Sequence, residues 1–142
     1  MKTKSTHVFA KITSVFSVFV LMSILFTTTV SASWYGWTYA TFNVSVIGTE
    51  HYYDGNNVGL NWGETTHNSN PNHINNRGGF TITLERKGWF GMWATIGSVT
   101  VDRNSGGNAN WTNVGPGTYR FCFSKANDGT TQYVTDIEMF SW

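Results

Sequence analysis

The sequence predicts an all-β fold, a single antiparallel β-sandwich of about seven or eight strands, with a small β-barrel as the alternative. One observation behind this prediction is the alternation of apolar and polar residues, clearest over residues 80–85 and 119–124. Another is that Gly- and Asn-rich turns, such as residues 54–57 and 104–108, separate these segments. Composition agrees, because 16% of the 142 residues are aromatic and 12% are charged, which favours strands and turns over helices.

The N-terminal segment has the pattern of a secretory signal peptide. Three lysines lie within its first eleven residues, and residues 12–30 carry no charge. Val30 and Ala32 occupy the −3 and −1 positions of a signal-peptidase site, which predicts cleavage before Ser33. The alternative is a retained membrane anchor, but the threonines at 27–29 are too polar for a good one.

We therefore predict two parts, a signal peptide over residues 1–32 and a β-sandwich domain over residues 33–142. The protein would be secreted into the extracellular space by Gram-positive-type export, with no stable membrane span after cleavage. Residues 33–142 hold six Lys or Arg and eight Asp or Glu, a formal charge of −2. Because a weakly acidic surface does not attract phosphate groups, we predict no nucleic-acid partner. The sequence leaves the oligomeric state open.

The first strand is predicted over residues 34–46, with a bend near Gly36 or Ala40 because it exceeds the usual strand length. Its faces would be Phe42, Val44 and Val46 on one side and Tyr35, Trp37 and Tyr39 on the other. Either both faces are covered, or the second face is an aromatic ladder open to solvent. Burial is the commoner outcome for clustered aromatic residues in a small domain.

Two hairpins and a long loop follow. Residues 51–53 and 58–62 predict the first hairpin, around a DGNN turn. The polar, Asn-rich residues 63–79 predict a loop that is functional or simply mobile. Residues 80–85 and the segment after Met92 predict the second hairpin, with KGWFG as its connection.

The last strand is predicted over residues 132–142. Tyr133, Ile137 and Met139 would share one face, with Phe140 and Trp142 on the other. Asp136 and Glu138 could form a general acid–base pair, but charge on an edge strand that discourages aggregation is the simpler interpretation.

The run from Asn113 to Tyr119 reads NVGPGTY, a turn followed by the clearest strand of the chain. It resembles the turn-and-strand of extracellular β-sandwich modules such as the B-type repeats of collagen adhesins. The chain as a whole resembles the small secreted β-sandwich exoproteins of Gram-positive bacteria. The resemblance implies a tyrosine corner, in which the Tyr119 hydroxyl folds back onto the backbone. We expect an organising hairpin here, with Phe121 and Phe123 in the core.

Sites for metal or covalent chemistry are weakly indicated. The one metal-like grouping is His51, Glu64, His67 and His73. No metal-binding spacing supports it, so solvated histidines are favoured. Cys122 is the single cysteine, so it cannot form an intramolecular disulfide, and a mid-strand thiol is more often packed than reactive. We predict no metal, no cofactor and no enzymatic activity.

The excess of aromatic residues points to binding. Trp89 and Phe90 are neighbours in a predicted hairpin tip, so they cannot both enter one core, and at least one should be exposed. We predict a ligand-binding surface from the aromatic residues Trp34, Tyr35, Trp37, Trp89, Phe90 and Trp93. The alternative is that these residues fill a core poor in Leu and Ile.

The leading hypothesis is a secreted, non-catalytic β-sandwich that binds an extracellular or cell-wall glycan through exposed aromatic side chains, since aromatic rings stack on sugar rings. One alternative is a secreted, bacteriocin-like antibacterial protein that acts on the envelopes of competitors. Another is a matrix or surface component that self-assembles through an exposed sheet edge.

Overall fold

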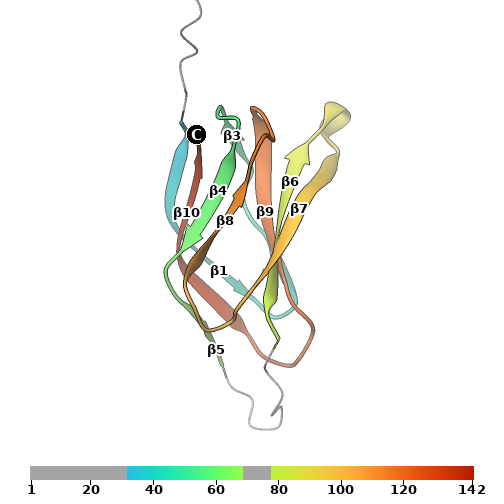
Figure 1. The fold of residues 1–142 in the computed structure, drawn as a ribbon. Coiled ribbons are helices and arrows are strands. Elements are labelled where there is room, and N and C mark those ends of the chain that lie inside the picture. The colour runs from blue at the N-terminus through green and yellow to red at the C-terminus, as the bar shows by residue number, and fades with distance from the viewer. Residues whose placement is uncertain (1–31, 69–77) are drawn as a thin grey trace, which may run out of the picture. The chain divides into compact units, whose positions relative to one another are not determined.

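Two antiparallel sheets of five strands each face one another in the computed structural model of the chain (Figure 1). The structure describes residues 32–68 and 78–142, apart from the side chain of Trp37. Most of the predicted signal peptide and the middle of the predicted loop, including His73, lie outside the described residues. The sheets do not close into a barrel, so the β-sandwich is confirmed and the barrel alternative is excluded.

Sheet A contains the C-terminal strand at its centre. Its order is β1 (Trp34–Phe42), β10 (Gln132–Ser141), β4 (Val58–Trp62) and β8 (Gly107–Trp111), and β5 (Thr65–His67) also pairs with β10. Sheet B has the order β2 (Ser45–Ile47), β9 (Gly117–Ser124), β6 (Phe80–Lys87) and β7 (Trp93–Val101), and β3 (His51–Tyr53) also pairs with β9. A short 3₁₀ turn, η1 (Trp89–Gly91), joins β6 to β7.

In sheet B, the alternation of apolar and polar residues in the sequence correctly predicts which side chains enter the core. In β6 and β9 every second residue is buried, and Phe121 and Phe123 enter the core as predicted. Sheet A closes the core from the other side with buried apolar residues of β4 and β10. The buried hydrophobic residues of these four strands are Val58, Leu60, Trp62, Phe80, Ile82, Leu84, Tyr119, Phe121, Phe123, Val134, Ile137 and Met139.

The predicted first strand is wrong in its length. The chain leaves sheet A after Phe42 and enters sheet B at Ser45, so β1 and β2 belong to different layers. Val44 lies at the crossing and is exposed rather than sharing a buried face with Phe42. The predicted bend is confirmed, because the pairing of β1 with β10 shifts register twice between Tyr35 and Ala40.

Two predicted hairpins, one around residues 54–57 and one around residues 112–116, are also wrong, because the chain crosses from one sheet to the other at each of these turns. β3 pairs with β9 and β4 with β10 and β8, so residues 54–57 cross between the sheets. Residues 112–116 also cross, from β8 in sheet A to β9 in sheet B. By contrast, β6 and β7 form the predicted hairpin. A sequence pattern shows which face of a strand is buried but does not name its partner strand.

The tyrosine corner is present. Tyr119 Oη lies 2.7 Å from the carbonyl oxygens of both Val114 and Gly115. Arg86 donates to the same turn, through Nη1 to Val114 O at 3.0 Å and through Nη2 to Pro116 O at 2.7 Å. The segment is therefore not a hairpin but a crossing between the sheets, and the hydrogen bonds of Tyr119 and Arg86 hold it in place.

The last strand differs from its predicted pattern. Asp136 has a φ of 53°, and the register of β10 against β1 shifts there, so the alternation restarts. Tyr133 therefore points outward, while Ile137 and Met139 point into the core. β10 also pairs on both sides, so Asp136 and Glu138 do not lie on an edge strand.

Candidate functional site

The outer face of sheet A carries a row of residues drawn from four strands. Trp34 of β1 is paired with Phe140 of β10, Phe140 with Gly59 of β4, and Gly59 with Asn110 of β8. At the usual inter-strand spacing, this row spans about 14 Å. In β4 and β10 the residues on either side of the row are buried, and Trp34 and Asn110 at its ends are exposed, so the row lies on the solvent side of the sheet.

Glycines let the aromatic rings of this row lie close to the sheet. A Cβ at Gly59 would stand 2.7 Å from Cε2 and Cζ of Phe140, so the Phe140 ring lies directly over this position. A Cβ at Gly36 would stand 2.0 Å from Cζ2 of Trp34, so this ring also covers a glycine. Trp34 remains 57% exposed, and Trp142 packs beside Phe140 with ring centroids 5.4 Å apart. The result is a set of rings supported from below and open above.

Polar side chains flank these rings. In the next row, Glu138 is paired with Asn61 and Asn61 with Asn108, two residues along from Phe140, Gly59 and Asn110. The side chains of Glu138, Asn61, Asn108 and Asn110 make no hydrogen bond to any other residue that the structure describes. We call the surface of Trp34, Asn61, Asn108, Asn110, Glu138, Phe140 and Trp142 the aromatic–amide face.

Of the six aromatic residues predicted to bind ligand, Trp34 lies on this face. Tyr35 points to the opposite side of β1, where it stacks on His51 with ring centroids 4.1 Å apart and its hydroxyl donates to Tyr52 O at 2.7 Å. The backbone of Trp37 lies in β1, and its side chain is outside the described part of the chain. Of the aromatic face for which burial was expected, Tyr39 is 76% exposed, so that expectation is wrong for this residue.

The other three predicted residues lie on the β6–β7 hairpin of sheet B. Trp89 and Phe90 are both almost fully exposed at its tip, which confirms that at least one could not enter the core. Trp93 is half-buried, with the Arg120 guanidinium 4.0 Å from its ring centroid. Figure 1 places this tip and the start of β1 on opposite sides of the sandwich. The predicted residues therefore do not form one surface.

A cleft of about 730 Å³ opens between the edge of β1 and the edge formed by β2 and β3. Tyr35, Tyr39 and His51 lie at its walls, and core residues of β9 and β10 form its floor. None of its lining residues is Asp, Glu, Lys or Arg, and burial lowers the pKa of His51, which favours the neutral imidazole. The cleft offers no charged group for catalysis.

The predicted metal grouping is not assembled among the described residues. His51 lies in sheet B and His67 in sheet A, and no group of three or more His, Cys, Asp or Glu side chains in residues 32–68 and 78–142 could hold an ion. Cys122 is half-buried, and its thiol donates to Glu85 Oε2 at 3.3 Å. Burial and the Glu85 carboxylate raise the pKa of the Cys122 thiol to about 11, so it is a poor nucleophile at neutral pH.

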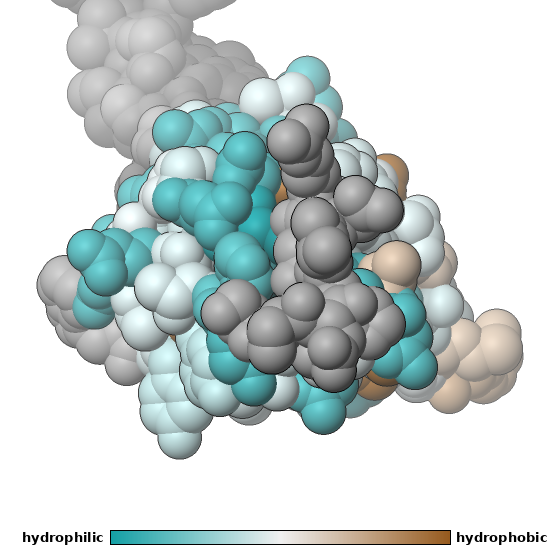
Figure 2. Space-filling model, turned by 90° about the horizontal axis from the view of Figure 1, so that it is seen from below, coloured by the Kyte–Doolittle hydropathy of each residue, from teal (hydrophilic) through white to brown (hydrophobic). Residues whose placement is uncertain are grey.

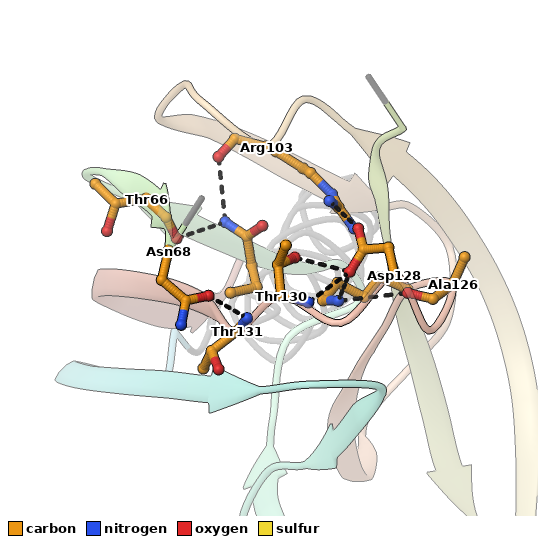
Figure 3. Close-up of polar contacts among 9 residues, drawn as sticks. Thr66, Asn68, Arg103, Ala126, Asp128, Thr130 and Thr131 are labelled. Atoms are coloured by element: carbon orange, nitrogen blue, oxygen red, sulfur yellow. Dashed lines mark hydrogen bonds and ion pairs between the residues drawn. The ribbon is translucent and has the colours of Figure 1, made fainter. Parts of the chain in front are cut away.

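A buried polar network ties the loops together at the lower end of the sandwich (Figure 3). Asp128 accepts hydrogen bonds from Lys125 Nζ at 2.6 Å and Thr130 Oγ1 at 2.7 Å, and it also pairs with Arg103. Burial opposes ionisation of Asp128, but these donors hold the pKa of the carboxyl well below its usual range. Seen from below, much of the described surface is hydrophilic (Figure 2). We assign the network to the fold.

Of the seven residues of the aromatic–amide face, sequence reasoning predicted only Trp34 as ligand-binding. It missed Asn61, Asn108, Asn110, Glu138, Phe140 and Trp142, of which Glu138 was considered only as part of an acid–base pair. A signal for the asparagines was present, because each alternates with an apolar residue in β4 or β8. What the sequence did not contain was the order β1, β10, β4, β8 of the strands in sheet A.

No protein-family model matches the chain, and no curated protein matches it. Among solved structures, it is similar to the Yersinia pseudotuberculosis-derived mitogen at 14% identity and a TM-score of 0.41, over 75% of this chain and 84% of that chain. It is similar to Aeromonas hydrophila PliG, a periplasmic inhibitor of g-type lysozyme, at 9% identity and a TM-score of 0.40, over 82% and 90%. It is similar to PirA at 14% identity and a TM-score of 0.34, over 78% and 91%. Similarities this low carry no conclusion about family or function.

In the described part of the chain, no helix is long and apolar enough to cross a membrane.

Proposed function

We propose that this chain is a secreted, non-catalytic β-sandwich that binds an extracellular or cell-wall glycan on the aromatic–amide face. The observation that carries the proposal is the row Trp34, Phe140, Gly59 and Asn110, in which two rings lie over glycines beside an unpaired amide. The C–H face of a sugar ring packs on such rings, and the sugar hydroxyls require partners that both donate and accept.

The polar residues of the face support a hydroxyl-rich ligand over an apolar one. Asn61, Asn108 and Asn110 each offer an amide donor and acceptor, and Glu138 adds an acceptor. A protein–protein interface core is usually richer in apolar side chains and poorer in charge. An extended glycan lying across the row could contact ring and amide groups together.

Retention on insoluble polysaccharide tests the proposal. Residues 31–142 form one compact unit that contains both sheets, so the chain beginning at Ser33 is a suitable test protein. We expect it to be retained on cellulose, chitin or isolated cell walls. Trp34→Ala should reduce retention about tenfold, which corresponds to about 1.4 kcal/mol for one lost ring contact. Asn61→Ala combined with Asn110→Ala should reduce it similarly.

Tyr39→Ala provides a matched control, because Tyr39 is 76% exposed and lies outside the aromatic–amide face. Its retention should equal that of the unmodified chain. The proposal fails if none of these polysaccharides retains the chain, or if Trp34→Ala and Tyr39→Ala are retained equally.

A further inference from the structure

We propose that the tip of the β6–β7 hairpin inserts into the interfacial layer of a lipid bilayer. This inference is independent of glycan binding, because the tip belongs to sheet B and the aromatic–amide face to sheet A. Trp89 is 90% exposed, Phe90 is 96% exposed and Met92 is 69% exposed. Three large apolar side chains in four consecutive positions are thus left in water by the folded domain.

The conformation of the tip is defined rather than loose. Gly88 N donates to Met92 O at 2.7 Å, and Gly91 N donates to Gly88 O at 3.2 Å. Phe90 has a φ of 66° and Gly91 a φ of 76°, so the turn holds a bulky residue in the left-handed region that usually favours glycine. These bonds close the turn on itself, and the Trp89 and Phe90 rings are presented to solvent without further ordering.

The chemistry of the tip suits a lipid interface. Residues 88–101 carry no charged side chain, so insertion of the tip would not bury a charge. Trp89 combines an apolar ring with an N–H donor, the combination that favours the boundary between headgroups and hydrocarbon. Phe90 and Met92 are apolar throughout and fit the hydrocarbon side.

The charges nearest the tip stay outside the inserted part. Lys87 pairs with Trp93 directly below the turn, and its Nζ lies 2.8 Å from both carboxylate oxygens of Glu50. This pair is half-exposed and can remain among the headgroups while the tip enters. Because Lys87 is already neutralised by Glu50 and residues 33–142 carry a formal charge of −2, the attachment depends on apolar burial rather than on attraction to anionic lipid.

The tip and the start of β1, where the chain enters the domain, lie at the same end of the sandwich (Figure 1). A pocket in a partner protein is the competing occupant, and the experiment separates the two.

Vesicle flotation tests the inference. The chain beginning at Ser33 is mixed with phosphatidylcholine vesicles, with or without phosphatidylglycerol, and the floated fraction is measured. We expect the unmodified chain to float and the double variant Trp89→Ser with Phe90→Ser to partition at least about tenfold less. Lipids brominated in the acyl chain should quench the tryptophan emission of the unmodified chain and not that of the double variant.

Trp34→Ser is the matched control, because it removes an exposed tryptophan from the aromatic–amide face and leaves the tip intact. Trp34→Ser should float like the unmodified chain. The double variant should in turn keep its retention on polysaccharide. Failure of the lipid proposal is therefore distinguishable from failure of the glycan proposal. Lipid insertion is overturned if the unmodified chain does not float, the result expected for a protein pocket. It is also overturned if the double variant floats equally, or if flotation requires phosphatidylglycerol.

Discussion

Ser33 and Ser141 are hydrogen-bonded to each other across 108 positions of sequence. Ser33 N donates to Ser141 Oγ at 3.0 Å, and Ser141 N donates to Ser33 O at 2.8 Å. The Ser33 hydroxyl also donates to Asp54 Oδ1 at 2.6 Å. The first residue of the predicted secreted chain is thus held beside a carboxylate and the end of the last strand.

Cleavage before Ser33 would convert its amide nitrogen into an ammonium group within this cluster. We therefore expect Asp54→Asn to lower the stability of the chain that begins at Ser33 by about 0.5–1.5 kcal/mol more than that of a chain with residues before Ser33. Thermal unfolding of the four proteins measures the difference. Equal losses in both backgrounds would show that the ammonium group does not interact with Asp54.

Tyr119→Phe should destabilise the domain by about 1–3 kcal/mol. The substitution removes the hydroxyl that bonds Val114 O and Gly115 O, and Gly115 O loses a partner in a partly buried turn. Urea unfolding gives the value. Tyr133→Phe, at an exposed position of β10, should change stability by less than about 0.5 kcal/mol. A similar effect of both substitutions would show that the Tyr119 hydroxyl does not stabilise the crossing at residues 112–116.

Asp128 makes the domain sensitive to acid. Because the pKa of this carboxyl is lower in the folded state than in the unfolded state, its contribution to stability is present above about pH 4 and is lost as the pH falls further. Asp128→Asn should cost about 3–5 kcal/mol at neutral pH, since it leaves Arg103 and Lys125 buried without their carboxylate.

The control for Asp128 is Asp136→Asn, because Asp136 is exposed and asparagine tolerates its positive φ. Denaturant unfolding as a function of pH should show a smaller stability loss on acidification for Asp128→Asn than for the unmodified chain. An identical acid dependence in the two proteins would show that Asp128 does not set it.

Cys122 should react slowly with iodoacetamide at pH 7. Burial and the Glu85 carboxylate raise the pKa of its thiol to about 11, so little thiolate is present, and the rate should climb steeply between pH 8 and about 11. In denaturant the thiol should titrate near its usual value of about 8.5 and react faster at neutral pH. Mass spectrometry of the alkylated fraction provides the measurement. Fast labelling of the folded chain at pH 7 would contradict this account.

Gly59→Ala should weaken polysaccharide retention although it replaces no aromatic residue. Its Cβ would stand 2.7 Å from the Phe140 ring and 2.7 Å from Asn110 Oδ1, so both side chains of the face must shift, with a stability cost of about 1–3 kcal/mol. Gly78→Ala is the matched control, since a Cβ there meets nothing within 4 Å. Retention and thermal unfolding are measured together. If retention is unchanged in Gly59→Ala, the positions of Phe140 and Asn110 over β4 do not matter to the glycan site.

The sequence by itself determined the fold class, the buried faces of β6 and β9, the exposed hairpin tip and the tyrosine corner. These features depend on residues close together in the chain. Alternation sets the buried side of a strand, and adjacent aromatic residues in a turn cannot share one core. The corner was implied by the resemblance of residues 113–119 to extracellular β-sandwich modules, and the contact itself is local, since the hydroxyl reaches back five residues from Tyr119 to Val114.

The tertiary structure alone decided where the chain crosses between sheets and which strands are neighbours. The crossing after Phe42 and the positive φ of Asp136 each reset the alternation, so Val44 and Tyr133 lie outside the core. The aromatic–amide face joins Trp34 to Phe140 and Gly59 to Asn110, pairs that are far apart in sequence. Such a face exists only after strand register is fixed, and register depends on packing between distant segments, because a shift by one residue would turn every side chain to the opposite face.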